Sequence, residues 1–282
     1  MKSVVLTNLK TKQVQLDSVK LSIIIPCYNE DITLKPLLRE IFKVKFPIDF
    51  EIIVVDDGSY NNHKFLILEE INSGKVKFIR LKQNQGKGFA IRVGLKYATG
   101  DIFIVRDAYL GYLPRDIPKL LTPILKNRTE VVYGTRFLKK PKGMSKSHYM
   151  ANRFLTLFTR ILYKCNITDV ETGYKIFTKK ALDKIKLNCR EFEFEPEITS
   201  KFLSKGFKIL DVPIVYQYRN HGTSKINWLD GFESLMILIR YRHLPYSLYY
   251  QYICKIYKHH VKKVLFKLID YFKKKFCLDK VF

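Results

Sequence analysis

Short apolar runs rich in β-branched residues recur along the first half of the chain, at 21–26, 51–55 and 101–105. Turn-forming residues bound each run, as is typical of strands buried on both faces. Between the runs, apolar side chains follow the three- and four-residue spacing of helices. Alternating strands and helices predict a doubly wound, mostly parallel sheet, and therefore a Rossmann-like α/β fold.

Further apolar runs continue this pattern through the second half of the chain. Candidate helices lie at 147–163, 197–205 and 228–240, and candidate strands lie at 76–81, 131–134 and 208–218. In doubly wound sheets a ligand binds beyond the carboxyl ends of the strands, where the strand order switches. The residues that directly follow each strand are therefore the first candidates for a functional site.

Three of these strands are followed by unusually polar segments. They read PCYNE at 26–30, DDGS at 56–59 and RDAYL at 106–110. Residues of these types also cap helices and shape turns, which explains any one segment taken by itself. Three acidic segments at strand ends of one sheet indicate more, because clustered carboxylates repel unless a cation or a hydrogen-bonding ligand compensates.

The composition is that of a folded globular protein with a large excess of positive charge. The 282 residues are 47% hydrophobic and include 51 Lys and Arg against 26 Asp and Glu, a formal charge of +25. This excess favours an anionic partner, either a nucleic acid, a phosphate-bearing small molecule or an anionic membrane surface. The sequence contains no recognised nucleic-acid motif, so no nucleic acid is expected as a partner, and a basic nucleic-acid-binding protein is kept only as a less favoured alternative.

Cysteine and histidine usage predicts a reducing, cytosolic setting. The five cysteines are far apart without a C-x-x-C pair, and the six histidines lack the paired spacing of a helical zinc site, so they are read as incidental. The first apolar run is too short for a signal peptide, and no window reaches the ~18 apolar residues that span a bilayer. We therefore expect a cytoplasmic protein that is neither secreted nor membrane-spanning.

Longer motifs between about 21 and 240 resemble family 2 glycosyltransferases, and within them the dolichyl- and polyprenyl-phosphate sugar transferases typified by dolichol-phosphate mannosyltransferase. In order, the motifs are IIIPCYNE, EIIVVDDGS, NQGKGFAIRVGLKYATGD, RDAYLGYLP, VVYGTRF, TDVETGYKIF, FEPEIT and VPIVYQYRNHGTSKI. The resemblance implies an A-type glycosyltransferase fold (GT-A fold). It also implies inverting transfer of one sugar from a nucleoside-diphosphate sugar to a polyprenyl or dolichyl phosphate, at the cytosolic face of a membrane. GDP-mannose and UDP-glucose or UDP-N-acetylglucosamine all remain open as donors.

The resemblance also implies roles for individual residues. It places the nucleotide against the first two strand-end segments, where Asp57 would read the base or ribose. Asp107 and Ala108 match the first two positions of the family's D-x-D motif, which holds Mg²⁺ or Mn²⁺ against the donor diphosphate. The implied catalytic residues are Asp107, Arg136, Arg219 and Lys225, the last three at basic positions that bind phosphates. The implied nucleotide-sugar site comprises Pro26, Tyr28, Glu30, Val55, Asp57, Asp107, Ala108, Arg136, Arg219 and Lys225.

The D-x-D motif departs from the family pattern, because its third position is Tyr109 and Gly111 follows where relatives often carry a polar side chain. Three interpretations remain open. Asp107 holds the ion alone but more weakly, since Mg²⁺ commonly needs only one or two protein carboxylates. Alternatively, the Arg and Lys residues of the site neutralise the diphosphate without metal. In the third interpretation catalysis is lost, and the chain only binds nucleotide-sugar.

Three other motifs are open to purely local explanations. Gly86-Lys-Gly88 is read as a tight turn into a helix, because Ile91 stands where a G-x-G-x-x-G loop needs its last glycine. The alternating glutamates of 191–197, with Pro196, are read as a helix start. The segment Asp169 to Thr172 either orients an acceptor phosphate or sugar hydroxyl, or caps the preceding helix.

After 240 the chain follows a different pattern, with apolar residues at helical spacing from Ile253 to Phe276 and lysines on the opposite face. Such a basic amphipathic helix lies in a membrane interface, or packs on a domain with its lysines in solvent. A lipid-borne acceptor favours the membrane, and with it a peripheral protein on the cytosolic face. The expected organisation is an N-terminal extension at 1–20, a catalytic domain at 21–240 and a basic amphipathic tail at 241–282.

Overall fold

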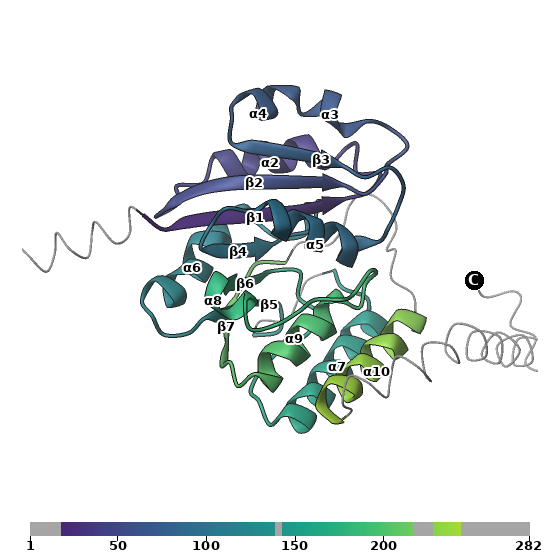
Figure 1. The fold of residues 1–282 in the computed structure, drawn as a ribbon. Coiled ribbons are helices and arrows are strands. Elements are labelled where there is room, and N and C mark those ends of the chain that lie inside the picture. Colours follow the sequence, from purple (N-terminus) through teal and green to yellow (C-terminus); the bar gives the residue numbers. More distant parts are fainter. Residues whose placement is uncertain (1–17, 139–142, 217–227, 244–282) are drawn as a thin grey trace, which may run out of the picture. The chain divides into compact units, whose positions relative to one another are not determined.

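A seven-stranded sheet forms the centre of the protein. The computed structural model describes residues 18–138, 143–216 and 228–243 (Figure 1). The chain divides into two units, residues 1–238 and 239–282, and the sheet belongs to the first. The predicted amphipathic helix of the tail, most of the N-terminal extension, Arg219 and Lys225 lie outside the described residues.

The sheet is mostly parallel, as the apolar runs predict. Its strand order is β3-β2-β1-β4-β6-β5-β7, so that β3 and β7 form its two edges (Figure 1). β6 runs antiparallel to both neighbours, and the other neighbouring pairs are parallel. The strands are β1 (Lys20–Cys27), β2 (Asp49–Asp56), β3 (Val76–Arg80), β4 (Ile102–Val105), β5 (Val131–Thr135), β6 (Lys175–Thr178) and β7 (Ile209–Pro213).

Helices cover both faces of the sheet. One core joins α2, α4 and α6 to one face through residues such as Leu38 and Leu121, and a second joins α5, α8 and α9 to the other through Ile91 and Ile198. α7 and α10 pack together through Leu155 and Leu238. The helices are α2 (Leu34–Phe42), α3 (His63–Leu66), α4 (Leu68–Asn72), α5 (Lys87–Tyr97), the 3₁₀ turn η1 (Pro114–Asp116), α6 (Ile117–Leu125), α7 (Lys146–Tyr163), α8 (Lys179–Leu182), α9 (Phe194–Ser204) and α10 (Trp228–His243).

The pairing of the central strands brings the polar segments together. β1 and β2 end in register, with Cys27 opposite Asp56, and the Asp57 N–H donates to the Cys27 carbonyl at 2.8 Å. β4 pairs with the other side of β1, and the Arg106 N–H continues the ladder to Ile24. The chain therefore leaves all three strands at the same edge of the sheet.

No helix within the described ranges is both long and apolar enough to cross a bilayer.

Candidate functional site

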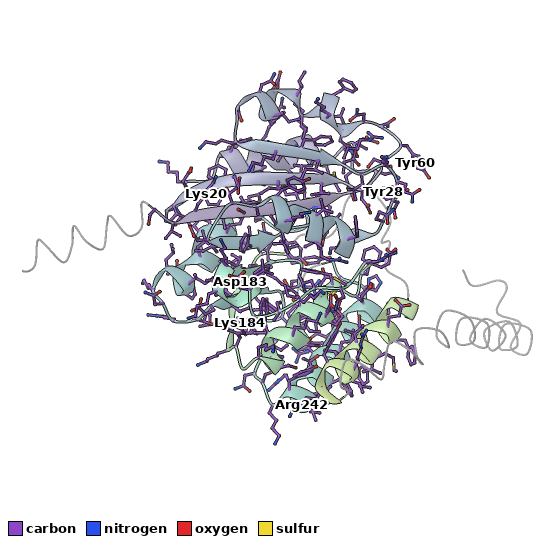
Figure 2. The ribbon with its side chains drawn as sticks, viewed as in Figure 1. Lys20, Tyr28, Tyr60, Asp183, Lys184 and Arg242 are labelled. Atoms are coloured by element: carbon purple, nitrogen blue, oxygen red, sulfur yellow. The ribbon has the colours of Figure 1, made fainter. Side chains whose placement is uncertain are left out.

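A cavity of about 940 Å³ lies beyond the carboxyl ends of β1, β2 and β4. Its walls also include the start of α5, the first half of α7, the start of α9 and part of α10. Figure 2 shows Tyr28 and Tyr60 near each other at this end of the sheet, and Lys20 at the opposite end of β1. Of the sequence-predicted residues, those lining the cavity are Pro26, Tyr28, Glu30, Asp57, Asp107, Ala108 and Arg136.

The first two strand-end segments are tied together by local hydrogen bonds. The Asn29 N–H donates to the Ser59 hydroxyl at 2.8 Å, and the Tyr60 N–H donates to the Asn29 side-chain oxygen at 3.0 Å. Asn29 has φ 54°, a left-handed conformation that asparagine tolerates better than most residues. Glu30 faces the cavity and also accepts a hydrogen bond from the Thr33 hydroxyl at 2.7 Å. The turn-forming role and the place in the site therefore coexist in this segment.

Asp57 joins the second segment to the start of α5. Its two carboxylate oxygens accept the backbone N–H groups of Gln85 at 2.8 Å and Gly86 at 2.9 Å. Burial raises the pKa of Asp57 to about 6, although these two hydrogen bonds act in the opposite direction. Asp57 therefore has a structural role that the sequence did not indicate, and its expected role in reading the base or ribose stays a prediction.

Lys87, in the first turn of α5, is a site residue that the sequence interpretation missed. Its ammonium lies 2.7 Å from Asp107 Oδ1 and 2.6 Å from Glu195 Oε1. Burial by itself lowers the pKa of a lysine, but the neighbouring Asp107 and Glu195 carboxylates raise that of Lys87 above its ordinary value. The side chain is therefore cationic at neutral pH.

The turn before Lys87 has the predicted tight geometry. Gly86 has φ 96°, and a Cβ atom there would lie 2.3 Å from the Arg190 carbonyl oxygen. A glycine is required here for both reasons, because a left-handed φ and a close backbone approach each exclude a side chain. The interpretation of Gly86-Lys-Gly88 as a turn into a helix is confirmed. It was incomplete because it did not place Lys87 in the cavity.

The glutamates of 191–197 have two different roles. Glu193 accepts the N–H groups of Arg190 and Glu191, and Glu197 accepts those of Asn188 and Cys189, as expected at a helix start. Glu191 and Glu195 instead line the cavity. For Glu195, the helix-start interpretation was therefore incomplete as well.

Tyr109, at the third position of the D-x-D motif, packs on Tyr112 with ring centroids 5.9 Å apart. Burial raises the pKa of the Tyr109 hydroxyl well above its ordinary value, so the phenol is neutral. Mg²⁺ and Mn²⁺ prefer charged and carbonyl oxygens, and a neutral phenol is a poor substitute for a carboxylate. With Asp107 Oδ1 already bound to Lys87, the described residues of this motif do not fit a divalent ion in the way that two carboxylates do.

Arg136 is held by an acidic partner. Asp169, which is fully buried, accepts hydrogen bonds from the Arg136 Nε and Nη2 atoms, each at 2.7 Å, and from its backbone N–H at 3.1 Å. Burial acts to lower the pKa of Arg136, but Asp169 raises it. Among the described residues Nη1 makes no hydrogen bond, so the guanidinium is oriented with one donor group left for a ligand. Asp169 therefore positions Arg136, a role that neither sequence interpretation included.

Glu171 also lines the cavity, and its Oε1 is buried without a hydrogen-bond partner among the described residues. Burial and the nearby Glu195 raise its pKa to about 7, while Lys175 acts in the opposite direction. Burial lowers the pKa of Lys175 to about 8. Two groups that titrate near neutral pH therefore lie in or beside the cavity.

Val55 is not among the residues that line the cavity, although the resemblance places it in the nucleotide-sugar site. Its side chain is fully buried in a core with Ile24, Ile53 and Ala90, against α5. Successive side chains of a strand point to opposite faces, and that of Val55 points into the α5 layer rather than into the cavity.

The sequence interpretation treated His63 as incidental, but the structure places it in a polar cluster. It is fully buried, with Nε2 3.1 Å from Asp31 and Nδ1 3.4 Å from Asp56. Cys27, Asp56 and His63 offer metal-ligating atoms within 4.8 Å of one another, the one such cluster of three among the described residues. A thiol and an imidazole suit a softer ion such as Zn²⁺ better than the harder ions Mg²⁺ and Mn²⁺.

The sequence of the chain matches a known family. The family model described as glycosyl transferase family 2 covers residues 22–186. A dolichol-phosphate mannosyltransferase of Pyrococcus furiosus is 32% identical over 79% of this chain and 63% of its own length, so this chain spans somewhat less than two thirds of that relative. A UDP-N-acetylglucosamine–dolichyl-phosphate N-acetylglucosaminyltransferase of Methanococcus voltae is 31% identical over 77% of this chain and 94% of its own length. A dolichyl-phosphate β-glucosyltransferase of Dictyostelium discoideum is 28% identical over 81% of this chain.

Solved structures share the fold. Glucosyl-3-phosphoglycerate synthase of Mycobacterium tuberculosis, solved with Mn²⁺ and UDP-glucose, superposes with a TM-score of 0.65 over 86% of this chain and 84% of its own, at 19% identity. At this identity the likeness concerns the fold alone, and it agrees with the predicted GT-A fold. The family match, the named relatives and the fold together show that the chain belongs to glycosyl transferase family 2 and is similar, within it, to the transferases that act on dolichyl phosphate.

Proposed function

We propose that the chain transfers one sugar from a nucleoside-diphosphate sugar to a polyprenyl or dolichyl phosphate, with inversion at the anomeric carbon. The observation that carries the proposal is the convergence of Glu30, Asp57, Asp107 and Arg136 on one cavity at the carboxyl edge of the sheet. The names of the relatives support the acceptor class. Those relatives use mannose, glucose and N-acetylglucosamine, so the donor sugar is left to experiment.

The proposed sugar transfer does not depend strongly on a general base. An oxygen of the acceptor phosphate attacks the anomeric carbon, the bond from that carbon to the donor diphosphate breaks, and the electron pair leaves with the nucleoside diphosphate. The acceptor is an anion at neutral pH, so it needs positioning more than proton removal. Arg136, oriented by Asp169, is suited to stabilise the charge that develops on the leaving diphosphate. Arg219 and Lys225 are proposed to add to it.

The surface of α7 supports a lipid-borne acceptor. Met150, Phe154, Leu157 and Ile161 form one exposed apolar stripe, with exposed fractions from 54% to 71%. Phe154 also lines the cavity. Between Lys146 and Lys164 the sequence contains Arg153 and Arg160 and no acidic residue. An apolar stripe among cations is typical of a helix that lies on an anionic membrane, and here the stripe reaches the rim of the site.

The proposed location follows from these features. Together with the basic tail 241–282, α7 would hold the protein peripherally on the cytosolic face of a membrane, where a polyprenyl phosphate presents its head group. A catalytically silent relative is not favoured, because the named relatives are transferases. Nucleic acid is not proposed as a partner.

A transfer assay tests the proposal. Purified chain is incubated with radiolabelled GDP-mannose, UDP-glucose or UDP-N-acetylglucosamine and with vesicles that contain dolichyl phosphate, in parallel with Mn²⁺ and with excess EDTA. We expect label from one donor to enter the organic-solvent extract, and only when dolichyl phosphate is present. The absence of lipid-linked label with every donor, under both conditions, would rule the proposal out.

A further inference from the structure

The third position of the D-x-D motif carries an aromatic side chain, Tyr109, which packs among other aromatic rings. The Tyr109 ring packs on Tyr112, which is itself stacked on Tyr174 with centroids 5.0 Å apart and tilted against Tyr216 at 5.9 Å. Tyr112 and Tyr174 are fully buried. Tyr109 therefore belongs to an aromatic cluster beside the cavity and is not a carboxylate position left empty.

Gly111 is matched to this arrangement. A Cβ atom at position 111 would lie 2.0 Å from Cε2 of the Tyr109 ring. Real Cβ atoms do not approach another heavy atom so closely, so any larger residue at 111 would displace the ring. The two departures from the family motif, Tyr109 and Gly111, are thus one structural feature.

The remaining carboxylate of the motif, Asp107, forms an ion pair with Lys87. The Lys87 ammonium bridges Asp107 and Glu195 at 2.7 and 2.6 Å, and its side chain is 15% exposed. An ion that bound Asp107 Oδ1 would have to displace the Lys87 ammonium from this partly buried carboxylate and would bring a further positive charge close to it. An ammonium has three N–H donors, and the two carboxylates use two of them among the described residues.

We propose that Lys87 is the resident cation of the donor site and takes the place of the divalent ion, so that the donor diphosphate binds without metal. The inference rests on the proposed function, because it assumes that the cavity binds a nucleoside-diphosphate sugar. In this arrangement Asp107 and Glu195 hold Lys87 in position, and its third N–H is directed to a diphosphate oxygen. Arg136 donates from Nη1 in the same cavity.

Donor binding by the wild-type protein tests the inference without any variant. Calorimetry measures the binding of UDP, GDP and the matching nucleotide-sugars to metal-stripped protein. Each titration is done once in excess EDTA and once with Mn²⁺. The expected dissociation constants in the two buffers agree within about threefold. Binding that appears only with Mn²⁺ would overturn the inference and leave the proposed function standing. Absence of nucleotide binding in both buffers would overturn both.

A direct measurement of the ion adds an independent readout. The electron paramagnetic resonance signal of free Mn²⁺ is followed while protein is added, with and without the nucleotide that binds. We expect added protein to cause no loss of the free Mn²⁺ signal beyond the loss that nucleotide alone causes. A protein-dependent loss of the signal that Asp107→Asn abolishes would contradict the inference.

A matched pair of lysine variants locates the cation. Lys87→Met is expected to weaken donor binding in EDTA by at least about tenfold, because a charge-assisted contact is lost. Lys96→Met, at an exposed position of the same helix, should bind as the wild type does. Circular dichroism establishes that both variants are folded. A folded Lys87→Met variant with unchanged donor binding in EDTA would refute the assignment.

Discussion

At the scale of single residues, the cavity brings more carboxylates together than cations. The described residues that line the cavity include two cationic side chains, Lys87 and Arg136. They include six carboxylates, those of Glu30, Asp57, Asp107, Glu171, Glu191 and Glu195. Each added negative charge disfavours ionisation of its neighbours. The raised pKa values of Asp57 and Glu171 are a consequence of this crowding together with burial. The described lining of the cavity therefore carries more negative than positive charge, which Lys87 and Arg136 offset only in part.

Glu171 gives a pH-dependent prediction. Its folded-state pKa of about 7 lies above the usual 4.5, so its ionisation is opposed in the folded protein. The resulting loss of stability is absent below about pH 4.5, grows as the pH rises, and is complete above about pH 7. We expect Glu171→Gln to raise the free energy of unfolding by on the order of 3 kcal/mol at about pH 8 and to change it little at about pH 4. Urea unfolding at both pH values measures this, and an equal effect at both would contradict the stated cause.

Arg136 gives a prediction about the geometry of the site. Arg136→Lys keeps the positive charge but loses the two parallel hydrogen bonds to Asp169 and the free Nη1 donor. Sugar transfer should fall by about tenfold or more, while the variant remains folded. Arg128→Lys, at an exposed position, is the control and should retain wild-type activity. Equal activity of the two variants would show that Arg136 is not in the donor site.

Residues of the site could be predicted from the sequence where they directly follow a strand. Tyr28 directly follows β1 and Asp57 directly follows β2, and the sheet brings them together because the ends of these strands share one edge. Lys87 and Glu195 form a pair across 108 positions, and nothing local in the sequence indicates such a contact. The side-chain direction of Val55 could not be predicted, because a strand that is buried on both faces carries no alternation of apolar and polar residues to show it.

At the scale of elements, α5 determines how the donor side of the site is built. The helix approaches the sheet closely at Gly94, where a Cβ atom would lie 2.5 Å from Ile24 Cγ2 and 3.3 Å from Val55 Cγ2. This approach explains why Val55 belongs to the core. It also fixes the height of the helix over the sheet, and so the position of Lys87 in its first turn.

Gly94→Ala should therefore destabilise the protein by about 1–3 kcal/mol, because the added methyl group overpacks the contact with β1. Combining it with Ile24→Ala should cost less than the sum of the two single changes, since the smaller residue makes room. Gly231→Ala in α10 is a useful contrast, because its Cβ has open space and alanine favours a helix by about 0.5–1 kcal/mol. Thermal unfolding measures all variants. A Gly94→Ala protein as stable as the wild type would contradict the close packing.

The exposed stripe of α7 gives a second prediction at this scale. Leu157→Asp combined with Ile161→Asp should lower the fraction of protein bound to anionic vesicles by at least about threefold, because the apolar face can no longer enter the interface. Phe65→Asp with Leu68→Asp, two exposed apolar positions on α3 and α4, should leave vesicle binding unchanged. Co-sedimentation with vesicles measures both. Equal binding of the two double variants would remove α7 from the membrane surface.

Most elements could be predicted from apolar runs and helical spacing, which are strong for strands buried on both faces. β6 was not predicted, because four residues that follow a turn motif give too short a pattern. α9 begins at Phe194, before the predicted start at 197, since proline is tolerated in a first helical turn and Pro196 lies there. The antiparallel direction of β6 depends on long-range pairing with β4 and β5, which a local pattern does not contain.

At the scale of the whole molecule, the family and the fold show a glycosyltransferase, and the net charge of +25 is compatible with the anionic substrates proposed for it. The charge favours both a diphosphate donor and an anionic membrane that carries a phosphate acceptor. The sequence predicted the family because its motifs follow strands and are read locally. The proposed replacement of the metal ion by Lys87 depended on contacts between distant segments, so it required the structure.

The most direct test of the central claim is the product of a single incubation. The donor that binds is mixed with the chain and dolichyl phosphate in vesicles, and released nucleoside diphosphate and lipid products are quantified together by mass spectrometry. We predict a dolichyl phosphate heavier by one sugar residue, formed in equal amount to the nucleoside diphosphate released. Release of nucleoside diphosphate with free sugar and no lipid product, or no release from any donor, would contradict the assignment of this cavity to sugar transfer onto a lipid phosphate.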